Sequence, residues 1–381
     1  MTQATAIRPA VIRTGAARQA PRRTAQCQAC GGVALTAFYA VPEIPVHSCL
    51  MVATREEALA FPRGDLELVF CEACGFIQNA GYDASLQHYS TDYEETQAFS
   101  PRFRSFLEEI CDDQNRKYRL DGKQVLEIGC GKGEFLVTLC ERSGCMGIGI
   151  DPGYRPERTQ SPARERIRFI QNFYGPKYRD LEADYVCCRH TLEHIGPVGS
   201  FVRLVRESIG DRPDVPVFFE LPDVERVLEE CAFWDIYYEH SSYFTLGSLA
   251  RLFRASGFDV HALWKAYDGQ YLMLEARPAA GPTAPRLREE DDLARVRAQV
   301  ATFRERIGRK HARLRGDVAA WKTAGKRIAV WGSGSKAVSY LTTLNLGGEI
   351  DAVVDINPHK WGRFLAGTGH EIVGPLSLIH I

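Results

Sequence analysis

Two pairs of cysteines carry the most specific chemical signal in the sequence. Cys27 and Cys30 form one Cys-x-x-Cys pair, Cys71 and Cys74 form a second, and a glycine follows each pair. Four thiolates in this arrangement can enclose one tetrahedral ion, which is typical of structural rather than catalytic zinc. The interval between the pairs exceeds the usual spacing of about 15–20 residues, so we expect an inserted loop at 41–62. A redox role of the pairs is the alternative, and we interpret Cys49 as a packing residue rather than a rival ligand.

A glycine-rich turn follows a predicted buried strand at 124–128. Gly129, Gly131 and Gly133 let the backbone turn tightly and pass close to a ligand. Asp151 lies about 20 residues farther on, at the end of the next predicted strand, where a carboxylate can accept hydrogen bonds from both hydroxyls of a ribose. The order of strand, turn, helix and acidic residue therefore predicts a ligand that carries an adenosine-like ribose.

The charges around this turn distinguish between two classes of nucleotide-like ligand. A dinucleotide-binding fingerprint would place its third glycine at position 134, where this chain has Glu134. The carboxylate of Glu127 would also repel a pyrophosphate at the turn, whereas it suits the cationic sulfonium and the amino group of S-adenosylmethionine. The sequence therefore predicts S-adenosylmethionine as the ligand of the turn.

These residues resemble those of the class I S-adenosylmethionine-dependent methyltransferases, in the segments 127–133 and 184–194 and at Asp151. The cysteine pairs and the segments 236–245 and 353–363 narrow the resemblance to the three-domain sugar C-methyltransferases that act on nucleotide-linked keto-deoxysugars. It extends from about residue 27 to 374, nearly the whole chain. The resemblance implies methyl transfer to the carbon beside a ketone through an enolate intermediate, with S-adenosylmethionine as donor and a structural zinc ion in the N-terminal module.

The resemblance also implies roles for residues at the acceptor site. His240 matches the proposed base of this family, and Glu239 matches its active-site neighbour, which could orient or polarise the imidazole. An imidazole suits proton abstraction because its ordinary pKa of about 6.5 leaves it largely neutral. Tyr238 or Tyr243 would donate to the developing oxyanion, and Tyr93 would take the place of a tyrosine in the catalytic pocket. A chance Glu-His pair at the surface is the alternative to the catalytic interpretation.

Further residues are expected to line the cofactor pocket. Asn172 and Phe173 end a strand at the place where methyltransferases commonly contact adenine, although a role at the edge of the core is the alternative. His190 and His194 flank the end of the following strand, on the ligand side. Lys336, in the glycine- and serine-rich turn 332–336, is the residue expected to contact a nucleotide diphosphate, although we interpret the turn itself as a packing turn.

Alternating strands and helices must position these residues. Buried strands are predicted at 124–128, 146–150, 167–170, 185–188 and 215–221, and helices at 100–112, 134–140, 201–208 and 245–255. The alternation predicts an α/β fold whose central, Rossmann-like domain has a mainly parallel sheet. Two later strands, at 260–265 and 271–275, are expected to pair antiparallel.

A second strand–turn–helix unit, at 327–354, predicts a smaller Rossmann-like domain at the C-terminal end. A single apolar stripe precedes it, which predicts a long bracing helix, with a dimerising coiled coil as the alternative. The strand–helix pattern then stops at 374–381, so we expect a truncated or foreign C-terminus. The predicted domains are a disordered basic tail (1–26), a zinc-binding module (27–90), an S-adenosylmethionine-binding methyltransferase domain (91–280), a linking helix (286–324) and a partial C-terminal Rossmann-like domain (326–381).

The composition is that of an ordinary globular protein. Hydrophobic residues make up 45%, charged residues 25%, and the net charge is −1, which excludes a wholly disordered chain, collagen and a coiled-coil rod. Without a signal peptide or a run of about 18 apolar residues, and with twelve cysteines, we expect a cytoplasmic protein in a reducing compartment. We expect a small-molecule acceptor, a nucleotide-linked keto-sugar, as the partner, and neither nucleic acid nor a membrane. The alternatives are an O- or N-methyltransferase of another small molecule and a non-catalytic zinc-ribbon protein that binds nucleic acid.

Overall fold

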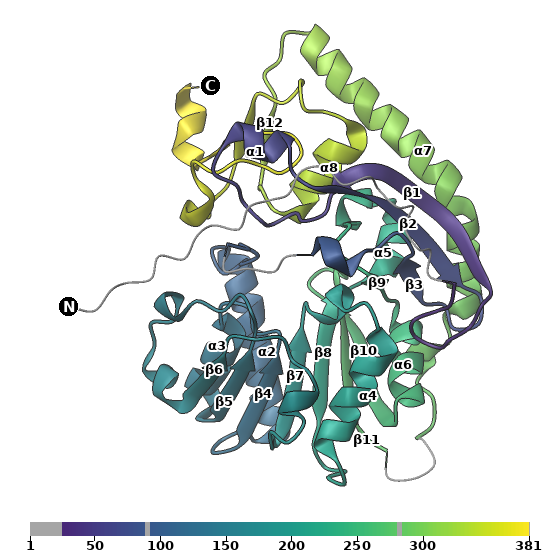
Figure 1. The fold of residues 1–381 in the computed structure, drawn as a ribbon, viewed down its shortest axis with the longest axis vertical. Coiled ribbons are helices and arrows are strands. Elements are labelled where there is room, and N and C mark those ends of the chain that lie inside the picture. Colours follow the sequence, from purple (N-terminus) through teal and green to yellow (C-terminus); the bar gives the residue numbers. More distant parts are fainter. Residues whose placement is uncertain (1–24, 88–91, 280–283, 381) are drawn as a thin grey trace.

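The computed structural model of the chain describes residues 25–87, 92–279 and 284–380 (Figure 1). Three sheets organise these residues, and the largest is a seven-stranded, mainly parallel sheet. The predicted α/β fold with a central Rossmann-like domain is confirmed. Of the tail predicted at 1–26, residues 1–24 lie outside the described part of the chain.

The central sheet has the strand order β10-β11-β8-β7-β4-β5-β6. Its parallel strands agree with the predicted ones to within two residues and are β4 (Gln124–Ile128), β5 (Met146–Ile150), β6 (Ile167–Ile170), β7 (Tyr185–Arg189) and β8 (Val217–Pro222). The remaining two strands form the predicted antiparallel hairpin, β10 (Phe258–Ala266) and β11 (Tyr271–Pro278). Strand β11 lies between β8 and β10. Because β4 to β8 run parallel, their carboxyl ends lie at one edge of the sheet.

Helices cover both faces of this sheet, as expected for crossover connections between parallel strands (Figure 1). They are α2 (Pro101–Tyr118) and α3 (Glu134–Ser143), and α4 (Val198–Ile209) and α6 (Leu246–Ala255); α5 (Val224–Glu230) instead packs into the core of the N-terminal sheet. Ser100 caps α2 by accepting a hydrogen bond from the Phe103 amide, and Thr245 caps α6 in a capping box with Ser248. Helix α2 runs six residues beyond its predicted end at 112, to Tyr118, and stops where Arg119 adopts a left-handed conformation with φ of 51°.

The N-terminal sheet joins two regions that are distant in the sequence. It consists of β1 (Leu35–Pro45), β2 (Arg63–Cys71), β3 (Ile77–Asn79) and β9 (Ser242–Tyr243), all antiparallel. The prediction of an inserted loop at 41–62 is therefore wrong in its first part, since β1 continues to Pro45, and α1 (Arg55–Leu59) occupies another part. The apolar side chains of Ile44, Val46 and Met51 explain the difference, because all three are buried in a core shared with the C-terminal domain.

The C-terminal domain is a three-stranded parallel sheet with one helix. Its elements are β12 (Ala329–Trp331), α8 (Ser335–Leu344), β13 (Ala352–Val354) and β14 (Ile372–Val373). The long helix α7 (Leu293–Thr323) leads into it and runs along β1 (Figure 1). The ring of Phe303 on this helix lies 5.8 Å from that of Phe38 and 5.5 Å from that of Tyr39. The apolar stripe of α7 is thus covered largely within the molecule.

The hydropathy of the described helices bears on whether any of them could span a membrane. None of them offers an apolar stretch of sufficient length to cross a bilayer.

Candidate functional site

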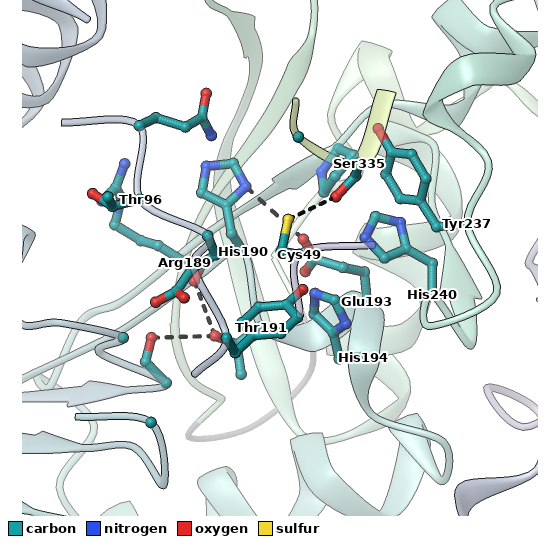
Figure 2. Close-up of a pocket in the computed structure, with 18 of the residues that line it drawn as sticks. Cys49, Thr96, Arg189, His190, Thr191, Glu193, His194, Tyr237, His240 and Ser335 are labelled. Carbon is teal, nitrogen blue, oxygen red and sulfur yellow. Dashed lines mark hydrogen bonds and ion pairs between the residues drawn. The ribbon is translucent and has the colours of Figure 1, made fainter. Parts of the chain in front are cut away.

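A cavity of about 1350 Å³ lies at the carboxyl edge of the central sheet. Residues from all three parts of the chain line it: Cys49 from the N-terminal module, the ends of β4, β5 and β7, and Ser335 at the start of α8. Figure 2 shows several of these side chains together. Since a single small-molecule site usually occupies about 300–1,000 Å³, this cavity has room for two ligands side by side.

The predicted glycine turn forms one wall of the cavity. Gly129, Gly131 and Gly133 all have positive φ, at 73°, 53° and 86°. A Cβ at Gly129 would lie 2.0 Å from the hydroxyl oxygen of Thr191, so only glycine fits there. Asp151 also lines the cavity, and its carboxylate accepts hydrogen bonds from the amides of Gly131 (2.9 Å) and Gly153 (2.6 Å). The turn and the acidic strand end are therefore joined as the sequence predicts.

Glu127 lies at the end of β4, in the wall of the same cavity. The residue is 2% exposed, and burial raises the pKa of its carboxyl group to about 8. Its Oε2 atom has no hydrogen-bond partner among the described residues. A cation bound in the cavity would lower this pKa and restore the carboxylate. The unsatisfied oxygen is therefore suited to an ammonium or sulfonium group, the ligand chemistry predicted for this position.

The structure also brings the other predicted cofactor residues to the cavity. Asn172 and Phe173 line it just beyond β6, and the ring of Phe173 is exposed. His190 lines it after β7, where its Nε2 atom lies 2.9 Å from Oε1 of Glu220. The imidazole ring also packs 4.5 Å from the ring of Tyr271. His190 is thus a fixed part of the cavity wall.

His240 lines the cavity in a cluster of rings (Figure 2). Its ring lies 4.8 Å from that of His194 and 4.7 Å from that of Tyr237. The residue is 6% exposed, and burial together with the neighbouring His194 holds the pKa of His240 well below its ordinary value. The imidazole is therefore neutral near pH 7 and has a lone pair with which to accept a proton.

Glu239 faces away from the cavity, toward the N-terminal module. Its Oε2 accepts a hydrogen bond from the Tyr93 hydroxyl (3.0 Å) and lies 3.1 Å from Nδ1 of His47, while the Ser48 amide donates to Oε1 (3.2 Å). Burial alone would raise the pKa of Glu239, but the hydrogen bond with His47 and the neighbouring histidines lower it to about 2. The predicted contact in which Glu239 orients His240 is not formed. Its carboxylate instead ties the segment before β9 to the N-terminal module and to Tyr93, which does line the cavity.

Two predicted oxyanion donors lie outside the cavity. The Tyr238 hydroxyl donates to the carbonyl of Gly81 (3.1 Å) and accepts from the amide of Asp83 (3.0 Å). The Tyr243 hydroxyl donates to the carbonyl of Tyr237 (2.8 Å). Both rings belong to the core shared with the N-terminal sheet, so this geometry contradicts the prediction that they contact an acceptor. Sequence reasoning overlooked Tyr237, which lines the cavity; its place in the aromatic run before Glu239 was the available signal.

The four predicted metal-ligating cysteines converge at one point. The sulfur atoms of Cys27 and Cys74 are 3.6 Å apart, and those of Cys30 and Cys71 are 3.7 Å apart. A tetrahedral ion bound at about 2.3 Å would hold its sulfur ligands about 3.8 Å apart. These two sulfur–sulfur distances match that spacing, and all four sulfur atoms lie within 4.8 Å of one another.

A second group of potential ligands lies in the cavity. It consists of Glu193, His194 and His240, whose ligand atoms fall within 4.8 Å of one another. An ion there would occupy the lone pair of His240, so metal binding and proton abstraction by His240 exclude one another. All three residues line the cavity, so this group can exchange a proton with a molecule bound there.

Comparisons with known proteins divide the chain into two matched regions. Residues 102–263 match a methyltransferase domain, and residues 276–380 match a C-methyltransferase C-terminal domain. The C-methyltransferase NovU of Streptomyces niveus is 28% identical over 273 residues, which cover 67% of this chain and 63% of NovU. The 2-ketoarginine methyltransferase of Streptomyces arginensis is 36% identical over 98 residues, covering 22% of this chain and 28% of the relative.

The chain thus spans less than two thirds of the length of NovU. Among solved structures, the 1,6-didemethyltoxoflavin-N1-methyltransferase of Burkholderia thailandensis, with bound S-adenosylhomocysteine, is 18% identical. The match covers 45% of this chain and 78% of that one, with a TM-score of 0.34.

Proposed function

Because the chain belongs to the class I S-adenosylmethionine-dependent methyltransferases that carry a C-methyltransferase C-terminal domain, we propose that it methylates a carbon atom beside a ketone of a nucleotide-linked sugar. The observation that carries this proposal is the shared cavity, which places the glycine turn and Asp151 in one wall and the neutral His240 in another. A donor and an acceptor could therefore meet inside it. The methyltransferase domain also argues against the alternative of a non-catalytic zinc-ribbon protein.

The donor would bind along the glycine turn. Its ribose hydroxyls would donate to Asp151, and its adenine would lie beside Asn172 and Phe173, which line that part of the cavity. Glu127 would face the positive charge at the other end of the donor. When bound, S-adenosylmethionine supplies an electrophilic methyl group on a positively charged sulfur.

His240 would act as the base on the acceptor. Its neutral imidazole would take the proton from the carbon beside the ketone, leaving an enolate. The enolate carbon would then form a bond to the methyl carbon as the sulfur–methyl bond breaks, and the protonated imidazole would return its proton to water. Charge balances because the sulfonium becomes a neutral thioether while the enolate returns to a ketone.

Tyr237 replaces Tyr238 and Tyr243 as the candidate for stabilising the oxyanion. This residue lines the cavity, and its hydroxyl donates to Oδ1 of Asp235 (2.9 Å). It would have to turn from Asp235 toward the ketone oxygen to donate to a developing negative charge. Tyr93, whose hydroxyl is bound to Glu239, would shape the pocket beside it.

Two relatives support carbon rather than heteroatom methylation. NovU is named a C-methyltransferase, and the name of 2-ketoarginine methyltransferase gives a ketone-bearing compound. The C-terminal domain would hold the nucleotide part of the acceptor, since Lys336 lines the cavity. Its ammonium group donates to Oε1 of Gln270 (2.8 Å) and is half-exposed, so a diphosphate could reach it.

Zinc would be held by Cys27, Cys30, Cys71 and Cys74. The sulfur spacing supports this assignment, and the closed set of four thiolates leaves no open position for catalysis. The ion would stabilise the turn that precedes β1 and the turn between β2 and β3.

The test is incubation with methyl-labelled S-adenosylmethionine and a panel of nucleotide-linked keto-sugars, followed by mass measurement of the products. We expect one sugar to gain a methyl group on carbon. In heavy water without the donor, the same sugar should exchange the proton beside its ketone, because the base acts before the methyl group moves. An O- or N-methylated product without this exchange would overturn the proposal in favour of the heteroatom alternative.

A further inference from the structure

Arg189 is a buried cation that the proposed mechanism does not use. It ends β7, lines the cavity and is 7% exposed. Its Nε atom pairs with the carboxylate of Glu220, and its guanidinium lies 4.3 Å above the ring of Phe135 at the start of α3. Its Nη2 atom has no hydrogen-bond partner among the described residues. A buried, unsatisfied N–H of a charged group is costly, which indicates a missing acceptor.

The other cationic side chains that line the cavity are already engaged. The ammonium of Lys132 donates to the carbonyls of Tyr93 and Gly153, each at 2.8 Å. Arg226 pairs with Glu230 and with Asp235. Lys336 donates to a glutamine, and Lys360 lies 3.6 Å from the carboxylate of Asp355. Arg189 is therefore the cation of the described cavity wall that retains an unsatisfied N–H.

Glu127 is the natural counterpart of Arg189. Both residues line the cavity, from the neighbouring parallel strands β4 and β7. Each has one buried polar atom without a partner, and the ion pairs of the described residues include none between them. Burial would lower the pKa of Arg189, but the charge of Glu220 raises it, so the guanidinium remains charged. Arg189 thus presents a positive charge to the cavity, and Glu127 presents a carboxyl group that a bound cation would ionise, with no direct ion pair between the two.

A ligand with an amino group and a carboxylate on one carbon would satisfy both residues. We propose, resting on the proposed function, that Arg189 binds the α-carboxylate of S-adenosylmethionine while Glu127 meets its α-amino group. A guanidinium suits this role because it presents a planar pair of donors to a carboxylate. Phe135 holds the plane of the guanidinium from the other side, and Glu220 fixes its Nε edge. The assignment makes this end of the cavity a site for the amino-acid part of the donor.

The test compares two ligands by calorimetry on the full chain. S-adenosylhomocysteine carries the amino-acid group, whereas 5′-methylthioadenosine has the same adenosine and sulfur without it. We expect Arg189→Met to lower the affinity for S-adenosylhomocysteine about 10- to 100-fold, which corresponds to the loss of one or two charge-assisted hydrogen bonds. In Arg189→Met, the affinity for 5′-methylthioadenosine should change less than about twofold. The affinity of Arg189→Lys for S-adenosylhomocysteine should lie between those of the wild type and Arg189→Met. Arg226→Met, at a cavity arginine held by acidic residues, is the matched control and should leave both ligands unchanged.

Each outcome separates this inference from the proposed function. If Arg189→Met weakens both ligands equally, the arginine only supports the fold, and the inference is overturned. Unchanged binding of S-adenosylhomocysteine by Arg189→Met overturns it as well. If the wild type binds neither ligand, the proposed function fails instead. If Arg189→Met does not fold, Arg189→Lys and a decarboxylated analogue of S-adenosylhomocysteine provide the same comparison. The wild type should bind the analogue more weakly than S-adenosylhomocysteine. This difference in affinity should be smaller for Arg189→Lys.

Discussion

Replacing His47 should destabilise the protein through Glu239. The two side chains are buried, and Nδ1 of His47 lies 3.1 Å from Oε2 of Glu239. His47→Leu removes this hydrogen bond, while the Tyr93 hydroxyl still donates to the same oxygen at 3.0 Å. His47→Asn is the matched control, because an asparagine amide can place a donor near the position of Nδ1.

The structure bounds the size of the effect in two ways. A hydrogen bond to a charged group contributes about 1.5–3 kcal/mol. Independently, lowering the pKa of Glu239 from 4.5 to about 2 corresponds to about 3 kcal/mol of stability at neutral pH, of which His47 supplies a part. We therefore expect His47→Leu to lose about 1.5–3 kcal/mol of unfolding free energy at pH 7, and His47→Asn to lose less than half of that.

The sign of the pH dependence follows from the lowered pKa. A carboxylate whose pKa is depressed in the folded protein stabilises it above the unfolded pKa, and this stability is lost as the pH falls toward the folded pKa. The stability difference between the wild type and His47→Leu should thus shrink between about pH 5 and pH 2. Urea unfolding followed by tryptophan fluorescence measures both quantities. A difference that stays constant with pH, or equal losses for the leucine and asparagine variants, would refute the reasoning.

Three further predictions concern the base, the metal and the bracing helix. His240→Asn should abolish methyl transfer while calorimetry still shows binding of S-adenosylhomocysteine; surviving turnover would place the base elsewhere. Cys71→Ser should release zinc, measured by atomic emission, and lower the thermal midpoint, because closed zinc sites contribute folding energy; unchanged zinc content would remove the metal assignment. Phe303→Ala should destabilise the chain by about 3–5 kcal/mol, since its ring is fully buried against Phe38 and Tyr39; a loss below about 1 kcal/mol in urea unfolding would contradict this packing.

The central sheet was predictable because its signals are local. Each parallel strand is a short apolar run next to a glycine, a proline or a charged turn, and the edge of the sheet then follows from the direction of the strands. Gly129 and Asp151 share that edge, so their meeting could be inferred without long-range information. The same rule placed His190 and His240 on the ligand side, and both line the cavity.

The contacts that no local pattern could reveal involve residues far apart in the chain. His47 and Glu239 are 192 residues apart, and the sequence around each of them does not indicate that the other is its hydrogen-bond partner. Tyr237 and Tyr238 are equivalent in type, yet Tyr237 lines the cavity whereas the Tyr238 hydroxyl donates to the carbonyl of Gly81. Such choices depend on how the N-terminal sheet packs, which the sequence pattern does not specify.

The position of β9 changes how the N-terminal module should be understood. This strand begins two residues after His240 and pairs with β3, which directly follows the second cysteine pair. The segment that carries His240, the proposed base, is therefore held on one side by the module's sheet and on the other by the hydrogen bonds of Glu239 to His47 and Ser48. A module that only stabilised itself would need neither connection. If zinc binds the four thiols as proposed, both connections depend on the fold that it closes, and its removal should displace His240 as well as unfold the module.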